Sequence, residues 1–250
     1  MTVFVCGEEV DDIWCGIYDA WMSRLGHANV RLEPSGCDRE LFCEYRDVER
    51  DPQKAANVVG SICSKLNEDI YEVVYKAALS QDRYRCDKIY RFLIYAFALG
   101  PGVVDMLQLP AVYEVFSMNR HIRGELDHMM GFTRFSQMKE GILLSRIGPK
   151  NDLTVLLAAH FADRMPQENW ILYDCNRKKA AVHQAGGGWV MVKADSAVWQ
   201  DRLEQETDEE VFEELWKTFH RTIAIKEREN PRCQRNMLPL RFRKYMTEMR

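Results

Sequence analysis

The sequence lacks a long apolar run. Its longest uninterrupted apolar stretch, residues 92–99, has eight residues, whereas a helix that crosses a bilayer needs about 20. The N-terminus, MTVFVCGEEV, has no basic start and almost no apolar core segment, so no secretory signal is expected. These absences predict a soluble, cytoplasmic protein without a membrane partner.

Common catalytic and cofactor motifs are missing too. The eight cysteines form no C-x-x-C pair, which excludes zinc ribbons, thioredoxin-like chemistry and the cysteine cluster loop of radical SAM enzymes. The sequence holds no G-x4-G-K-S/T phosphate loop, no G-x-S-x-G nucleophile elbow and no zinc-deaminase signature. No cofactor is therefore expected.

The composition is that of a globular protein. Of the 250 residues, 46% are hydrophobic and 29% are charged, which is ordinary for a folded chain. The net charge of −4 conceals an asymmetry, because residues 201–216 carry a net −7 and residues 217–250 a net +7. The basic C-terminal segment is either a surface for a polyanion or a tail folded onto acidic neighbours.

Hydrophobic periodicity predicts an α+β protein with a helical N-terminal half. A strand at residues 2–6 opens the chain, and the aperiodic residues 26–50 predict a loop with one short strand at residues 41–45. Asp51 and Asn67 are expected to cap two helices. Further helices are predicted at residues 83–99 and 110–130.

The second half predicts a small, mostly antiparallel sheet of β-α-β-β-β order, followed by a long C-terminal helix. The expected elements are strands at residues 141–147, 170–175, 179–184 and 188–193 and a helix at 153–165. Thr207 and Glu210 form a capping box for the C-terminal helix, which Asn230-Pro231 ends. Residues 1–82 and 83–250 form either two domains or one continuous domain.

One helical strip carries a weak candidate for a metal site. His121, Glu125 and His128 lie at steps of four and three, so they project from one face of a helix. Two imidazoles and a carboxylate suit zinc. The spacing is not an established zincin motif and supplies no fourth ligand, so the other interpretation is three ordinary helix-surface residues.

Two further groups suggest contact with nucleic acid. Phe132 and Phe135 flank Arg134, a unit that can stack a base and hold a phosphate. The alternative places both rings in the core and pairs the guanidinium with an acid. His160 and Arg164 lie one helical turn apart, a spacing that suits proton transfer or phosphate recognition.

Several short segments follow one another in a distinctive order: GFTRF at 131–135, HFADR at 160–164, NW at 169–170 with Asp174, WKTF at 216–219, IKER at 225–228, NPR at 230–232, MLP at 237–239 and KY at 244–245. In this order they resemble a bacterial family of DNA metabolism or DNA repair proteins built around a domain of unknown function. The resemblance covers residues 83–250 closely and the N-terminal third more loosely.

The resemblance implies a link to DNA. Members of that family are typically encoded beside a radical SAM protein associated with DNA repair or modification, and some are fused to a uracil-DNA-glycosylase-like domain. The leading hypothesis is therefore a nucleic-acid-binding accessory protein acting with a radical SAM partner. Its expected DNA contacts are Phe132, Arg134, Phe135, Arg164, Lys226, Arg228, Arg232, Arg241 and Lys244.

Two other hypotheses remain open. In the first, the chain is an enzyme acting on DNA, with His128 and His160 as general acid and base, Asp174 orienting one of them and Arg164 holding a phosphate. In the second, it is a protein–protein adaptor whose basic segment docks on a partner and never touches DNA.

Overall fold

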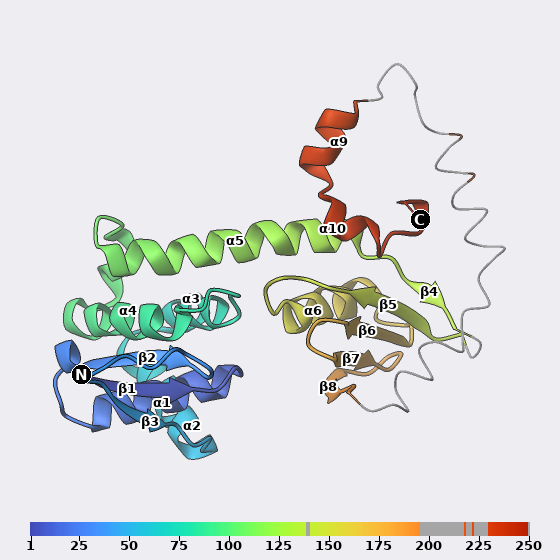
Figure 1. Cartoon of the computed structure of the whole chain (residues 1–250). Helices are drawn as coiled ribbons and strands as arrows, with labels where there is room; N and C mark the ends of the chain where they lie inside the picture. The colour runs from blue at the N-terminus through green and yellow to red at the C-terminus, as the bar shows by residue number, and fades with distance from the viewer. Residues whose placement is uncertain (139–140, 196–217, 219–221, 223–229, 250) are drawn as a thin grey trace. The chain divides into compact units, whose positions relative to one another are not determined.

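The computed structural model describes residues 1–138, 141–195, 218, 222 and 230–249. The chain is α+β, as predicted, and its residues fall into two compact units, Met1–Arg123 and Gly124–Arg250 (Figure 1). The division lies within helix α5, Pro110–Phe132, whereas the sequence predicted either one continuous domain or a boundary between residues 82 and 83, and that boundary stays a prediction. Helix α4, Arg85–Leu99, contributes a buried face to the core of the first unit.

The first unit contains a three-stranded parallel sheet of order β2-β1-β3. Its strands are β1 (Thr2–Cys6), β2 (Val30–Pro34) and β3 (Glu44–Asp47). The prediction of a loop across residues 26–50 was wrong at β2. This strand has only two aliphatic residues, Val30 and Leu32, which alternate with charged ones, so its signal is too short to stand out.

Four α-helices accompany this sheet: α1 (Val10–Met22), α2 (Pro52–Lys65), α3 (Glu68–Ala78) and α4. Both predicted caps are confirmed, because the Asp51 carboxylate accepts a hydrogen bond from the Gln53 amide and the Asn67 side chain accepts one from the Ile70 amide. Gly100 ends α4 with a φ of 80°, a conformation that favours glycine. Two short 3-10 helices, η1 (His27–Asn29) and η2 (Pro101–Asp105), complete the elements before α5.

The second unit contains a five-stranded sheet of order β4-β5-β6-β7-β8. Its strands are β4 (Ser136–Gln137), β5 (Leu143–Ile147), β6 (Trp170–Asp174), β7 (Lys179–His183) and β8 (Trp189–Lys193). Strands β5 and β6 are parallel and are joined through helix α6 (Thr154–Arg164), and the other pairs are antiparallel. The predicted β-α-β-β-β order is confirmed, with β4 as an added edge strand.

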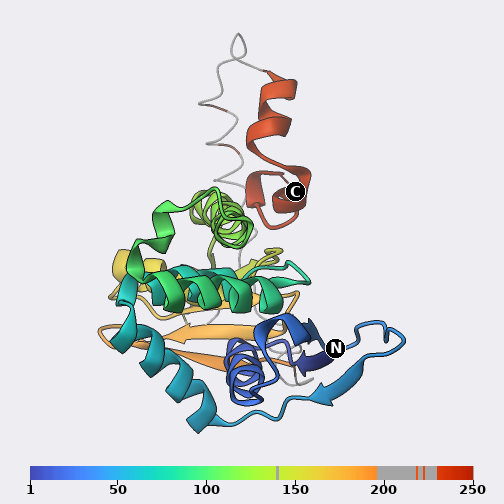
Figure 2. The same cartoon turned by 90° about the vertical axis from the view of Figure 1, so that its left-hand side faces the viewer.

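The predicted long C-terminal helix, with its capping box at Thr207 and Glu210, lies outside the described residues except for Thr218 and Thr222, which are helical. The described C-terminal segment, residues 230–249, contains α9 (Pro231–Met237), α10 (Leu240–Arg243) and η4 (Thr247–Met249). Asn230 begins α9, because its side chain accepts a hydrogen bond from the Cys233 amide. In Figure 2, where α5 is seen nearly end-on, the short helices at the C-terminus lie next to α5, and α9 extends away from it.

In the part of the chain that the structure describes, no helix combines the length and apolar character that crossing a membrane requires.

Candidate nucleic-acid interface

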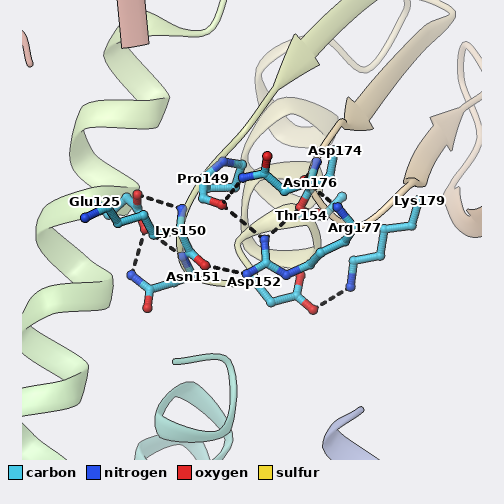
Figure 3. A network of polar contacts seen from close by, with 10 residues as sticks. All are labelled: Glu125, Pro149, Lys150, Asn151, Asp152, Thr154, Asp174, Asn176, Arg177 and Lys179. Carbon is cyan, nitrogen blue, oxygen red and sulfur yellow. Dashed lines mark hydrogen bonds and ion pairs between the residues drawn. The ribbon is translucent and has the colours of Figure 1, made fainter. Parts of the chain in front are cut away.

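Residues 148–153 lead from β5 into α6 at an edge of the second sheet. Because β5 and β6 are parallel, their carboxyl ends lie together at this edge, a place where α/β folds commonly bind ligands. Figure 3 shows that side chains from α5 and from the β6–β7 turn hold this loop.

Glu125 holds the loop from α5. Its carboxylate is buried and accepts hydrogen bonds from the backbone amides of Lys150 and Asn151, both at 2.9 Å, and from the Asn151 side chain at 2.7 Å. The Arg241 guanidinium lies 3.1 Å from the same carboxylate. These donors compensate for the cost of burying a charge, so Glu125 joins the loop to the C-terminal segment.

This arrangement uses the carboxylate of the weak metal-site candidate His121, Glu125 and His128 for other contacts. Both carboxylate oxygens of Glu125 are occupied by donors, whereas His121 is exposed on α5. Across the described residues, no three His, Cys, Asp or Glu side chains are grouped so that they could hold a metal ion.

Asp174 closes the turn between β6 and β7. Its fully buried carboxylate accepts hydrogen bonds from the backbone amides of Asn176 and Arg177 and from the Thr154 hydroxyl, and it pairs with the Arg177 guanidinium at 3.1 Å. Asn176 and Arg177 in turn donate to the carbonyl of Pro149 (Figure 3). Its described partners include no histidine, so the structure gives Asp174 a role in building the turn.

The two predicted catalytic histidines lie in different surroundings. His128 stacks on Phe132, with ring centroids 5.8 Å apart, and also contacts the ring of Phe242. His160 lies against Phe161 on α6. Among the described contacts of His128 and His160 none is with Asp174, and the acid–base role of these three residues stays a prediction.

The aromatic residues expected to stack on a base pack against other rings of the protein. Phe132 contacts Phe242 as well as His128. Phe135 lies edge-on to Phe161, with centroids 5.0 Å apart, and to Trp170. Of the two interpretations of this motif, the contacts favour packing.

Arg134 likewise has a partner within the protein. Its guanidinium lies 2.7 Å from the carboxylate of Glu248, whose side chain is only 3% exposed, and it also donates to the Gly131 carbonyl. Together with the Arg241–Glu125 pair, this pair attaches the C-terminal segment to the end of α5. Arg134 and Arg241, predicted to bind phosphate, each pair with an acid of the protein, and phosphate binding by either of them stays a prediction.

Tyr245 fixes the last part of the C-terminal segment on the same loop. Its ring lies against Gly148 so closely that a Cβ atom at that position would collide with the Tyr245 hydroxyl. Lys244 hydrogen-bonds to this hydroxyl, which raises the pKa of the lysine, while its side chain remains exposed. Burial raises the pKa of the neighbouring Cys175 thiol, so this cysteine is not an activated nucleophile.

Two described basic residues, Arg232 and Arg235, lie on α9. All seven residues of α9 are exposed, and Arg232 and Arg235 make no ion pair within the described ranges. Arg164 is exposed at the end of α6. Lys226 and Arg228, also predicted as DNA contacts, lie outside the described residues.

Sequence reasoning missed Glu125, Glu248 and Arg177 as the residues that build this region. The Arg134–Glu248 pair joins residues 114 positions apart, and no local pattern signals such a pairing. A run of bases shows charge but does not show which cations the protein itself neutralises.

Comparison with known families supplies the classification. The model of a domain of unknown function, DUF4130, matches residues 83–248. The chain belongs to this family. The match begins just before α4 and covers the whole described second unit apart from its last residue, Met249. No curated protein and no solved structure matches the chain.

Proposed function

We propose that this DUF4130 protein is a DNA-binding accessory component of a DNA repair or modification system and that it acts with a radical SAM protein encoded nearby. The observation that supports DNA binding is the exposure of Arg232 and Arg235 without ion-pair partners among the described residues. The radical SAM partner and the repair role rest on the family resemblance of the sequence.

The charge of the C-terminal segment supports this proposal. Residues 230–249 carry five bases and one acid, a net charge of +4, in a chain whose net charge is −4. Cations that the protein leaves unneutralised attract phosphates by releasing counterions from the nucleic acid. In this proposal Arg232, Arg235 and Lys244 contact the DNA backbone, and Arg134 and Arg241 hold the segment in place.

The test is fluorescence anisotropy with labelled single- and double-stranded DNA over a salt series. We expect the logarithm of affinity to fall linearly with the logarithm of salt concentration. The double variant Arg232→Ala/Arg235→Ala should reduce the magnitude of that slope by about one for each phosphate that the variant no longer binds.

A matched control is available on α5. Arg120 and Arg123 are also exposed and three residues apart on a helix, so Arg120→Ala/Arg123→Ala removes the same charge from another place. We expect this control to retain the wild-type slope. Equal affinities and slopes in the wild type and the α9 variant would refute DNA binding by α9.

A protein–protein adaptor is the second candidate, because Met237 and Leu240 are each 65% exposed beside the arginines. Exposed apolar side chains at this position favour contact with another protein. Co-purification with the radical SAM protein from nuclease-treated lysate, at low and high salt, separates the candidates. A complex that survives high salt, combined with no DNA binding, would favour the adaptor.

A further inference from the structure

A pocket in the first unit lies between α1, α2 and α4. Its volume is about 480 Å³, within the roughly 300–1,000 Å³ that small-molecule sites occupy. Most of its lining is apolar, and a few polar side chains complete it, which is the usual composition of such sites.

One wall of this pocket is aromatic. It consists of Tyr18 and Trp21 from α1 and Phe97 from α4. The Trp21 ring makes edge contacts with Phe97 at 5.4 Å, with Tyr90 at 5.8 Å and with His27 at 4.8 Å between centroids. These contacts hold the indole in place before a ligand arrives, which lowers the entropic cost of stacking a ring on this wall.

Polar side chains of α2 also line the pocket. Asn57, Ser61 and Lys65 follow one another at steps of four residues, so they lie in line along the helix. Within the described part of the chain, Lys65 makes no ion pair and the Ser61 hydroxyl makes no hydrogen bond. The Asn57 carbonyl accepts from Gln53, and its amide group remains available to donate.

A second hollow of about 420 Å³ shares Trp21 and Met22 with the first and is also lined by Arg24 and His27. Each hollow that Trp21 lines also has one basic side chain in its lining, Lys65 in the first and Arg24 in the second. Aromatic and basic side chains in one lining suit a flat, negatively charged ligand.

We infer that this pocket binds a planar aromatic ligand carrying a phosphate, of the class of the nucleoside monophosphates. The ring packs among the aromatic side chains of Tyr18, Trp21 and Phe97, two of which, Trp21 and Phe97, lie edge-on to each other. Polar atoms on the ring edge bond to Asn57 and Ser61, and the phosphate pairs with Lys65. None of these residues belongs to the C-terminal segment, so the inference does not depend on the proposed DNA binding.

The experiment is isothermal titration calorimetry of the full chain with dAMP, dGMP, dCMP and dTMP. We expect at least one of these nucleotides to bind with a dissociation constant below about 1 mM. The corresponding nucleoside should bind about tenfold more weakly because it lacks the charge-assisted bond to Lys65, and inorganic phosphate alone should not bind.

Variants locate the site. Lys65→Ala should reduce nucleotide affinity to that of the nucleoside and leave nucleoside affinity unchanged, whereas Lys65→Arg should retain nucleotide binding. Ser61→Phe fills the pocket and should abolish binding of both ligands. Ser64→Phe places the same ring on α2 at an exposed position that does not line the pocket, so it should bind as the wild type does.

Two results would overturn the inference: no nucleotide binds, or Lys65→Ala and Ser61→Phe both bind like the wild type. If Ser61→Phe fails to fold, Lys65→Ala decides alone, because it truncates a side chain at the rim of the pocket. Arg232→Ala/Arg235→Ala should leave nucleotide affinity unchanged, which separates failure of this inference from failure of the proposed DNA binding.

Discussion

At the scale of single residues, Glu125 joins three parts of the second unit. Its carboxylate accepts hydrogen bonds from the backbone amides of residues 150 and 151 and from the Asn151 side chain, and it forms an ion pair with the Arg241 guanidinium. A buried carboxylate with this many donors cannot be removed without leaving several polar groups unpaired. Glu125, which the helical spacing suggested as a weak candidate for a metal ligand, is therefore expected to matter for stability.

We predict that Glu125→Ala lowers the free energy of unfolding by about 3 kcal/mol, because it leaves buried donors and a cation without their acceptor. Arg241→Ala should cost less, since the Arg241 side chain is 37% exposed and the three remaining donors still satisfy Glu125. Urea denaturation of both variants measures the two changes. A smaller effect for Glu125→Ala than for Arg241→Ala would contradict this account of Glu125.

Tyr90 supplies a prediction about pH. Burial raises the pKa of its phenol to about 12, and its hydroxyl lies 2.8 Å from the ring nitrogen Nδ1 of His27. In the unfolded chain the phenol ionises near pH 10. The folded state therefore has its full advantage below pH 10 and loses it as the pH rises from about 10 towards 12.

Tyr90→Phe should cost about 1 kcal/mol at pH 7, the usual value of one hydrogen bond. Above pH 10 the difference between the two proteins should shrink by up to about 1.4 kcal/mol per pH unit and then change sign, because phenylalanine has no proton to lose. Urea denaturation at several pH values between 7 and 12 measures the difference in free energy of unfolding between the two proteins. A difference that stays constant over this range would show that ionisation of Tyr90 does not cause the loss of stability at high pH.

At the scale of helices and strands, local signals decided what the sequence could predict. Asp51 and Asn67 predicted the starts of α2 and α3 because a capping side chain accepts a hydrogen bond from an amide only two or three residues further along the chain. Strand β2 was not predicted, because it is held in the sheet by its pairing with β1 and its own alternation of apolar and charged residues is short.

In the candidate interface, too, local features could be predicted from the sequence and distant contacts could not. The exposure of Arg232 agreed with a simple count of bases, but the ion pairs of Arg134 and Arg241 are made with acids distant in the sequence. Charge patterning identifies a basic segment and leaves open which of its cations are neutralised within the fold. Only the three-dimensional arrangement separates the cations of this segment that pair with an acid from those that have no ion pair in the described part of the chain.

At the scale of the whole molecule, the family match and the compact units divide the chain differently. The match begins at residue 83, whereas α4 belongs to the core of the first unit through Ile89, Tyr90, Phe92 and Leu93, all fully buried. It contacts β2, α3 and α1. A boundary before α4 would therefore separate this helix from the surface it covers.

The last prediction concerns fragments cut at these two positions. Burying four large apolar side chains stabilises a fold by roughly 6–12 kcal/mol, which is comparable with the whole stability of a domain. The fragment 1–82 lacks this contribution, while 1–123 retains it together with Val112, Val115 and Met118 of the same core. We expect 1–123 to unfold cooperatively on heating, followed by circular dichroism, and 1–82 to show no cooperative transition. Cooperative unfolding of 1–82 would instead place the boundary where the family match begins.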